Sequence, residues 1–73
     1  MESASAQKVL AVLSEESRWR IVKILMSSSV ALSLSEVAER VGKDKRTVDK
    51  HLKALMEVGL VERSLGEESM YAV

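Results

Sequence analysis

The stretch Ser33–Gly59 decides the fold of this chain. Its sequence, SLSEVAERVGKDKRTVDKHLKALMEVG, contains two helical patterns separated by a short turn. Ser33 and Glu36 have the spacing of a capping box, in which each side chain accepts a hydrogen bond from the other residue's backbone N–H. A helix is therefore predicted over 34–41. It ends at Gly42, because glycine readily adopts the left-handed conformation of a helix C-terminus.

A second helix is predicted over 45–58, directly after this turn. Asp44 is a favourable N-cap for it, and Val48, Leu52 and Leu55 form its apolar stripe. Two helices joined by about three residues that include a glycine form the helix-turn-helix arrangement. The stretch therefore predicts a helix-turn-helix unit.

Segments on both sides of this unit complete the predicted fold. Earlier in the chain, apolar residues recur at helical spacing, and later two short segments with a turn at Gly66 indicate a hairpin. The expected fold class is mainly α with a small β-hairpin, a winged helix-turn-helix with a three- to four-helix bundle and a two-stranded wing. The predicted helices cover about 5–13, 16–27, 34–41 and 45–58, and the wing covers about 60–73, with strands over 60–65 and 69–73.

Size and composition limit the class of protein. With 73 residues and 8.1 kDa, residues 1–73 are expected to form one domain, either a small complete protein or a domain of a longer one. A hydrophobic content of 47% excludes a disordered tail. The longest uncharged stretch, Ile24–Ser35, contains five serines and is too short and polar to span a bilayer. The chain has no cysteine and no signal-like N-terminus, so a reducing, cytoplasmic location is expected.

The charges are unevenly distributed, although eleven Lys and Arg residues balance eleven Asp and Glu residues. From Arg40 to Lys53 the chain has six bases and two acids, a net charge of +4, and the remainder has a net charge of −4. Such asymmetry is typical of a surface that meets phosphate. From charge alone, a solvated helix face with chance clustering is an equally good interpretation.

The helix over 45–58 places its bases on one side. Relative to Val48, the directions of Arg46, Lys50 and Lys53 are about 160°, 200° and 140° around the helix axis, opposite the apolar stripe. Such a helix fits the major groove of B-DNA, where its N-terminal residues reach base edges. The residues predicted to contact DNA are Lys43, Lys45, Arg46, Thr47, Asp49, Lys50, Lys53 and Arg63.

These residues have different expected roles. Arg46 and Lys50 are the candidates for guanine O6 and N7, and Lys45 and Thr47 in the first turn are candidates for phosphate contacts. Asp49 has two interpretations. It accepts a hydrogen bond from a cytosine amino group, or it pairs with Lys45 or Lys53 and stays off the DNA.

One set of residues follows a recognisable order along the chain: Leu13, Arg18, Ile21, Glu36-Val37-Ala38, Thr47-Val48, His51-Leu52, Leu55 and Gly59-Leu60-Val61. This order resembles that of the ArsR-type winged-helix regulators. The similarity covers roughly Leu13 to Val73, and the spacing from His51-Leu52 to Gly59-Leu60-Val61 is its most specific part. It implies a DNA-binding transcription regulator, in which His51 has a structural, packed or hydrogen-bonding role.

The sequence departs from the family pattern at several places. Family members often have a small hydroxyl residue where this chain has Asp49, and a basic wing tip where it has Glu67 and Glu68. Acids there repel phosphate, although they are also typical of a solvated turn. Many ArsR-type proteins sense metals through clusters of cysteine or histidine. This chain has one histidine and no cysteine, so neither metal sensing nor any cofactor is expected.

A homodimer is a further expectation. Many family members dimerise through a C-terminal helix beyond the point where this sequence stops, so the first helix is expected to supply the contact here. The expected dimer surface includes Leu10, Trp19 and Met26, although Trp19 is an equally good candidate for an ordinary core residue. A dimer places two DNA-reading helices roughly 34 Å apart and predicts a palindromic site.

Two other classes of function were compared with the DNA-binding regulator. A winged-helix protein-interaction module in a larger assembly is favoured by the neutral total charge and the acidic wing. An enzyme is not favoured, because no phosphate-binding loop, metal cluster or nucleophile with a base is visible in the sequence.

Overall fold

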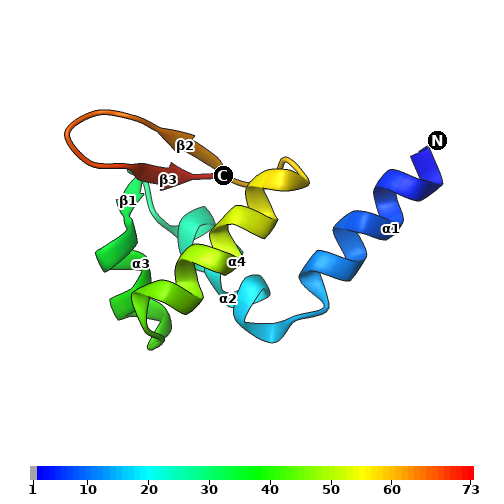
Figure 1. The fold of residues 1–73 in the computed structure, drawn as a ribbon, viewed down its shortest axis with the longest axis horizontal. Helices are drawn as coiled ribbons and strands as arrows, with labels where there is room; N and C mark the ends of the chain where they lie inside the picture. The colour runs from blue at the N-terminus through cyan, green and yellow to red at the C-terminus, as the bar shows by residue number, and fades with distance from the viewer. Residues whose placement is uncertain (1) are drawn as a thin grey trace.

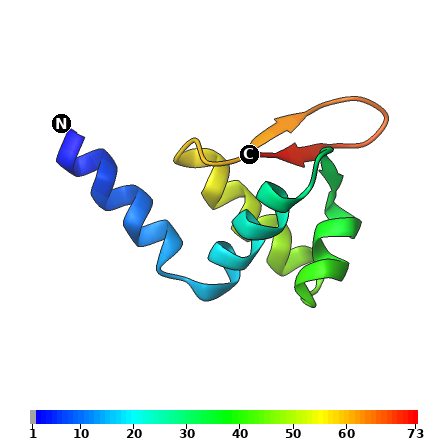
Figure 2. The same cartoon turned by 180° about the vertical axis from the view of Figure 1, so that it is seen from behind.

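The helices α2, α3 and α4 pack into a three-helix body with a small sheet at one end (Figures 1 and 2). A computed structural model describes the backbone of residues 2–73 and the side chains from Ala6 onward. The helices are α1 (Glu2–Leu13), α2 (Glu16–Ser27), α3 (Leu34–Val41) and α4 (Lys45–Glu57). The strands are β1 (Leu32–Ser33), β2 (Glu62–Ser64) and β3 (Met70–Ala72).

These elements confirm the predicted winged helix-turn-helix and adjust its boundaries. The helix predicted over 5–13 begins earlier, at Glu2, and the helix predicted over 45–58 ends at Glu57. Both wing strands are shorter than predicted, with three residues each. At the end of α4, Gly59 has a φ of 79°, and the Leu60 N–H donates to the carbonyl of Leu55, which closes the helix.

The sheet has three strands, one more than the predicted wing. β3 lies between β1 and β2 and is antiparallel to both. Leu32 of β1 is opposite Tyr71, which is also opposite Arg63 of β2. Because β1 directly precedes α3, the additional strand fixes the base of the wing to the start of the helix-turn-helix unit.

The core lies where α2, α3, α4 and the sheet meet. Its apolar residues come from each of these elements and recur at helical spacing on the three helices. They are Ile21, Val22, Leu25, Leu32, Val37, Ala38, Val41, Val48, Leu52, Leu55, Val61 and Tyr71. The core therefore fixes one side of α4 and leaves the opposite side to solvent.

The first helix is arranged differently. In both views α1 projects away from the body, on the side opposite the wing loop (Figures 1 and 2). Near its end, Val12 and Leu13 are partly buried against the core. Leu10, one turn earlier, keeps 67% of its surface exposed. The apolar residues of α1 are thus only partly covered within one chain.

Candidate nucleic-acid interface

Two caps hold the helix-turn-helix unit in place, as the sequence predicts. The backbone N–H of Ser33 donates to Glu36 Oε1 at 2.9 Å, and the backbone N–H of Glu36 donates to Ser33 Oγ at 3.2 Å. These hydrogen bonds hold the pKa of Glu36 below its usual value, with a smaller contribution from Arg40. Gly42 has a φ of 75° and its N–H donates to the carbonyl of Ala38 at 2.9 Å, so it ends α3 in the left-handed conformation.

The side chain of Asp44 caps the N-terminus of α4 by accepting hydrogen bonds from two donor groups of Thr47. Its Oδ2 accepts from the backbone N–H of Thr47 at 3.0 Å, and its Oδ1 accepts from the Thr47 hydroxyl at 2.7 Å. The hydrogen bonds from Thr47 hold the pKa of Asp44 below its usual value, so the carboxylate is ionised at neutral pH. The cap therefore fixes the first turn and also places a negative charge at the N-terminus of α4.

The exposed side of α4 is basic. Val48, Leu52 and Leu55 are completely buried, which confirms the predicted orientation of the apolar stripe. The four basic residues Lys45, Arg46, Lys50 and Lys53 are all exposed. Arg46, Lys50 and Lys53 lie opposite the apolar stripe, and we call these three residues the basic face of α4. Among the described residues, no other element covers this side of α4. A single exposed helix has the width that a major groove admits.

Asp49 forms an ion pair on this helix. Its Oδ2 lies 3.0 Å from Lys53 Nζ, one helical turn away. Of the two interpretations of Asp49, pairing is the one observed in the free protein, and Lys53 is the partner. An exposed pair of this kind adds little stability, because water screens it and both side chains lose mobility. Its main effect is to neutralise one of the three charges of the basic face.

The residues predicted for phosphate contacts lie in different surroundings. Lys43 is exposed in the turn, and Arg63 is exposed on β2, in the wing. Thr47 is half-buried and its hydroxyl proton is already donated to Asp44. A phosphate contact by that hydroxyl would require this hydrogen bond to be exchanged. Glu67 and Glu68 are exposed at the tip of the wing.

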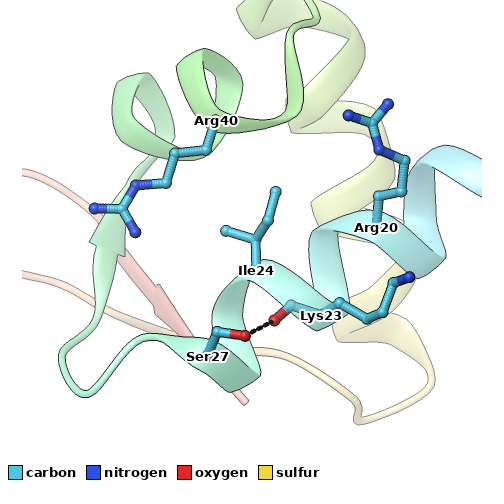
Figure 3. A pocket seen from close by; sticks show the side chains of 5 residues that line it. All are labelled: Arg20, Lys23, Ile24, Ser27 and Arg40. Carbon is cyan, nitrogen blue, oxygen red and sulfur yellow. Dashed lines mark hydrogen bonds between the residues drawn. The ribbon is translucent and has the colours of Figure 1, made fainter.

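A second basic group lies between α2 and α3, where it lines a cavity of about 290 Å³. Arg20, Lys23 and Arg40 surround Ile24 there (Figure 3). In that view the guanidinium groups of Arg20 and Arg40 point away from each other, so they do not converge on one ligand atom. Arg40 therefore belongs to a different surface from the basic face of α4, although both fall in the positively charged segment of the sequence.

The predicted dimer residues are all exposed. The exposed fractions are 67% for Leu10, 46% for Trp19 and 65% for Met26. The interpretation of Trp19 as an ordinary core residue is therefore wrong. Lys23 Nζ lies 6.0 Å from the centre of the Trp19 ring, within the range of a cation–π interaction. The helices α1 and α2 thus present three large exposed apolar side chains, a feature that is typical of a contact surface.

His51 has the hydrogen-bonding role that the family resemblance implies. Its Nδ1 accepts a hydrogen bond from Arg18 Nε of α2 at 3.2 Å. Arg18 was among the residues that carry the resemblance, but the sequence gives no signal that these two side chains meet. They are separated by 33 positions and come together only because α2 packs against α4.

In the described part of the chain, no helix is long and apolar enough to cross a membrane. Among the described side chains, no three of the types His, Cys, Asp and Glu lie close enough together to hold a metal ion.

Comparison with known proteins identifies a family and several solved structures similar to this chain. Residues 12–71 match the family described as HVO_A0114. The fold is similar to that of an ArsR-like transcriptional regulator from Rhodococcus sp. RHA1, with a TM-score of 0.85 and 36% identity over 99% of this chain. The matched region is 67% of that regulator, so this chain spans about two thirds of its length. No curated protein sequence matches the chain.

Two further solved structures show the same arrangement. Reduced HlyU from Vibrio cholerae N16961 is 26% identical, with a TM-score of 0.83 over 99% of this chain and 75% of that one. The winged helix-turn-helix DNA-binding domain of Mb0332 from Mycobacterium bovis, described as homodimeric, has a TM-score of 0.87 at 22% identity. That match covers 96% of this chain and 64% of the other, and at this identity it shows the fold alone.

Proposed function

The chain belongs to the HVO_A0114 family and to the ArsR-like transcriptional regulators, and we propose that it is a sequence-specific regulator that binds double-stranded DNA. In this proposal α4 enters the major groove and reads base edges. The function involves no enzymatic step and no cofactor.

The observation that carries the proposal is the basic face of α4. Arg46 and Lys50 are exposed one helical turn apart, directly opposite the completely buried Val48 and Leu52. In the major groove, Arg and Lys donate to guanine O6 and N7, and this is the commonest specific contact. We assign base reading to Arg46 and Lys50, because they lie in the first half of the helix, which reaches deepest into the groove.

Phosphate contacts would fix the position of α4 on the duplex. Lys43 and Lys45 flank the N-terminus of α4, and Arg63 is exposed on β2 in the wing; we assign backbone contacts to these three bases. The carboxylate of Asp44 repels a phosphate at the N-terminus of α4, and the ion pair between Asp49 and Lys53 neutralises one positive charge of that helix. We therefore expect this chain to bind DNA more weakly than a homologue that lacks these carboxylates.

We further propose a homodimer formed through α1. The domain of Mb0332 is described as homodimeric, and in this chain Leu10 of α1 is an exposed apolar residue without a partner among the described side chains. Trp19 and Met26 of α2 are also exposed apolar residues, and we include them in the proposed contact. Two copies related by a two-fold axis would present two α4 helices to adjacent major grooves, roughly 34 Å apart, and would prefer a palindromic site.

The experiment that tests the proposal is a titration of the protein into labelled random-sequence duplex DNA at several salt concentrations, followed by anisotropy. The expected result is an affinity that falls with salt, with a slope of about −0.9 per phosphate contact on a logarithmic scale. Selection of a preferred site from a random library would then test sequence specificity.

Absence of binding even at low salt would contradict the proposal. It would favour a winged-helix module that binds another protein. The exposed Glu67 and Glu68 at the wing tip are the observation that supports this second candidate, because they repel phosphate where many relatives attract it.

A further inference from the structure

One guanidinium group connects three helices of this molecule. Arg18, in the first turn of α2, donates from Nε to His51 Nδ1 of α4 at 3.2 Å and from Nη1 to the backbone carbonyl of Val12 in α1 at 3.4 Å. Both hydrogen bonds are partly buried. Because the guanidinium is planar and presents its donors in a rigid fork, the two contacts fix the end of α1 relative to α4.

Few other contacts hold α1 in place. Val12 and Leu13 pack against the core from its last turn, while Leu10 remains exposed. Farther out, Lys8 and Val9 face the end of α4 across an open cavity of about 240 Å³, which Glu57 and Val58 line on the other side. The direction of α1 therefore depends mainly on its last turn, where Arg18 binds the carbonyl of Val12.

The hydrogen bond to His51 requires one protonation state. The arginine is always the donor, so His51 Nδ1 must carry no proton, and the ring is neutral. A proton on Nδ1 would replace an acceptor with a donor and place two positive groups against each other. Burial lowers the pKa of His51 below its usual value of 6.5, and the neighbouring Arg18 lowers it further.

The charged groups around His51 also favour the neutral ring. They are Arg18 of α2, Lys43 of the turn and Lys50 of α4, with Glu15 at the N-cap of α2 acting in the opposite direction. Three cations and one carboxylate thus surround the imidazole.

We propose that Arg18 and His51 are positioning residues that set the angle between α1 and α4, and that protonation of His51 releases α1. The consequence for DNA rests on the function proposed above, because there α1 joins two copies and its angle sets the separation of the two α4 helices. Acidification would then reduce binding to a palindromic site while leaving each basic face unchanged.

The direction of the pH effect follows from proton binding. The unfolded chain binds a proton on His51 near pH 6.5, and the folded chain binds it only at lower pH. The contribution of the neutral ring to stability is therefore complete above pH 6.5 and is lost as the pH falls through the folded-state pKa. The released state of α1 would be populated in that same acidic range.

The test follows the position of α1 through its distance from α3, which packs against α4, and does not use DNA. Because the chain has no cysteine, spin labels can be attached only to the two introduced in Gln7→Cys/Glu39→Cys, at exposed positions on α1 and α3. The labelled protein is diluted into excess unlabelled protein, so that electron–electron distance measurements report one chain. We expect a single narrow distance distribution at pH 8, and a second, broader population that grows as the pH falls below 6.5.

Variants of the two positioning residues keep the test independent of folding defects. His51→Asn retains an acceptor near the position of Nδ1 and should give the narrow distribution at every pH. His51→Leu and Arg18→Lys should both give the broad population even at pH 8, with about a tenfold change in the ratio of the two states. Circular dichroism at each pH confirms that the variant tested is folded.

Two results would overturn the proposal. One is a distribution in folded wild-type protein that does not change between pH 8 and pH 5. The other is pH dependence in His51→Asn equal to that of the wild type. Neither result depends on DNA binding, so failure of this proposal is distinguishable from failure of the proposed function.

Discussion

The helix pair α3–α4 and the first helix α1 all have apolar residues at helical spacing, yet they are stabilised in different ways. In the pair, the apolar residues Val37, Val41, Val48 and Leu52 are almost fully buried, and caps at Ser33 and Asp44 satisfy the helix ends. In α1, Leu10 is two-thirds exposed, Val12 and Leu13 are only partly buried, and Arg18 and Ser14 each donate one hydrogen bond to a carbonyl of the last turn.

The difference shows which apolar surfaces are buried within a single chain and which stay exposed. The helix pair buries its apolar side within one chain and presents a charged side to a ligand. The first helix leaves apolar surface uncovered, which is costly unless a second surface covers it. In the function proposed above, the helix pair is the ligand-binding unit and α1 is the unit that meets another copy.

The largest expected difference between the two regions is in stability. Leu52→Ala removes a completely buried side chain of α4 and should lower the free energy of unfolding by about 2–5 kcal/mol. Leu10→Ala should change the stability of the monomer by less than about 0.5 kcal/mol, because the side chain is exposed. Urea unfolding at low protein concentration measures both, and equal losses would contradict the contrast.

A smaller loss is expected at the turn between α3 and α4. Gly42 has a φ of 75°, where a side chain is strained, although no atom lies within 4 Å of the position that a Cβ would occupy. Gly42→Ala should therefore lower the free energy of unfolding by about 1–2 kcal/mol through the backbone alone. Gly66→Ala is the matched control, since its surroundings are equally open and its φ lies outside the left-handed region. A loss of the same size in the control would show that the turn conformation is not the cause.

The cap at Asp44 should have a modest effect that depends on pH. Asp44→Ala should lower the midpoint of thermal unfolding at pH 7, and Asp44→Asn should lower it less, because asparagine is also a good N-cap. The pKa of this carboxyl is below 3.8 in the folded chain, so its contribution is complete above pH 3.8 and is lost as the pH falls through the folded-state value. A difference between wild type and Asp44→Ala that persisted undiminished well below that range would contradict the assignment.

The smallest effect on folding, and the one most specific to α1, is expected at Leu10. Leu10→Asp should leave the far-ultraviolet circular dichroism unchanged but shift the protein from dimer to monomer in sedimentation equilibrium. An aspartate in place of the exposed leucine puts a charge into the proposed contact between copies. Leu65→Asp on the wing, where the leucine is also exposed, is the control and should leave the association unchanged.

Local patterns made most of the helix pair predictable. The capping box at Ser33, the left-handed Gly42 and the cap at Asp44 each depend on residues three or four positions apart, and all three are confirmed. The stripe of Val48, Leu52 and Leu55 likewise determined which side of α4 is exposed. The DNA contacts assigned to that side remain predictions.

Features that depend on distant parts of the chain were not predictable in the same way. β1 has only two residues, and it is a strand because β3 pairs with it from far along the sequence. The hydrogen bond between Arg18 and His51 requires α2 and α4 to pack together first. Arg40 belongs to the basic segment of the sequence, but the packing of α3 against α2 places it on another surface.

The most direct test of the account compares two double variants that remove the same charges from different surfaces. Arg46→Ala/Lys50→Ala changes the basic face of α4, and Arg20→Ala/Lys23→Ala changes the cavity between α2 and α3. Affinity for a selected duplex is measured by anisotropy at one salt concentration. We expect a loss of at least about tenfold for the first variant, since each base contact contributes about 1–3 kcal/mol, and a much smaller loss for the second. Equal losses in the two variants, or no loss in the first, would contradict the claim that α4 reads the DNA.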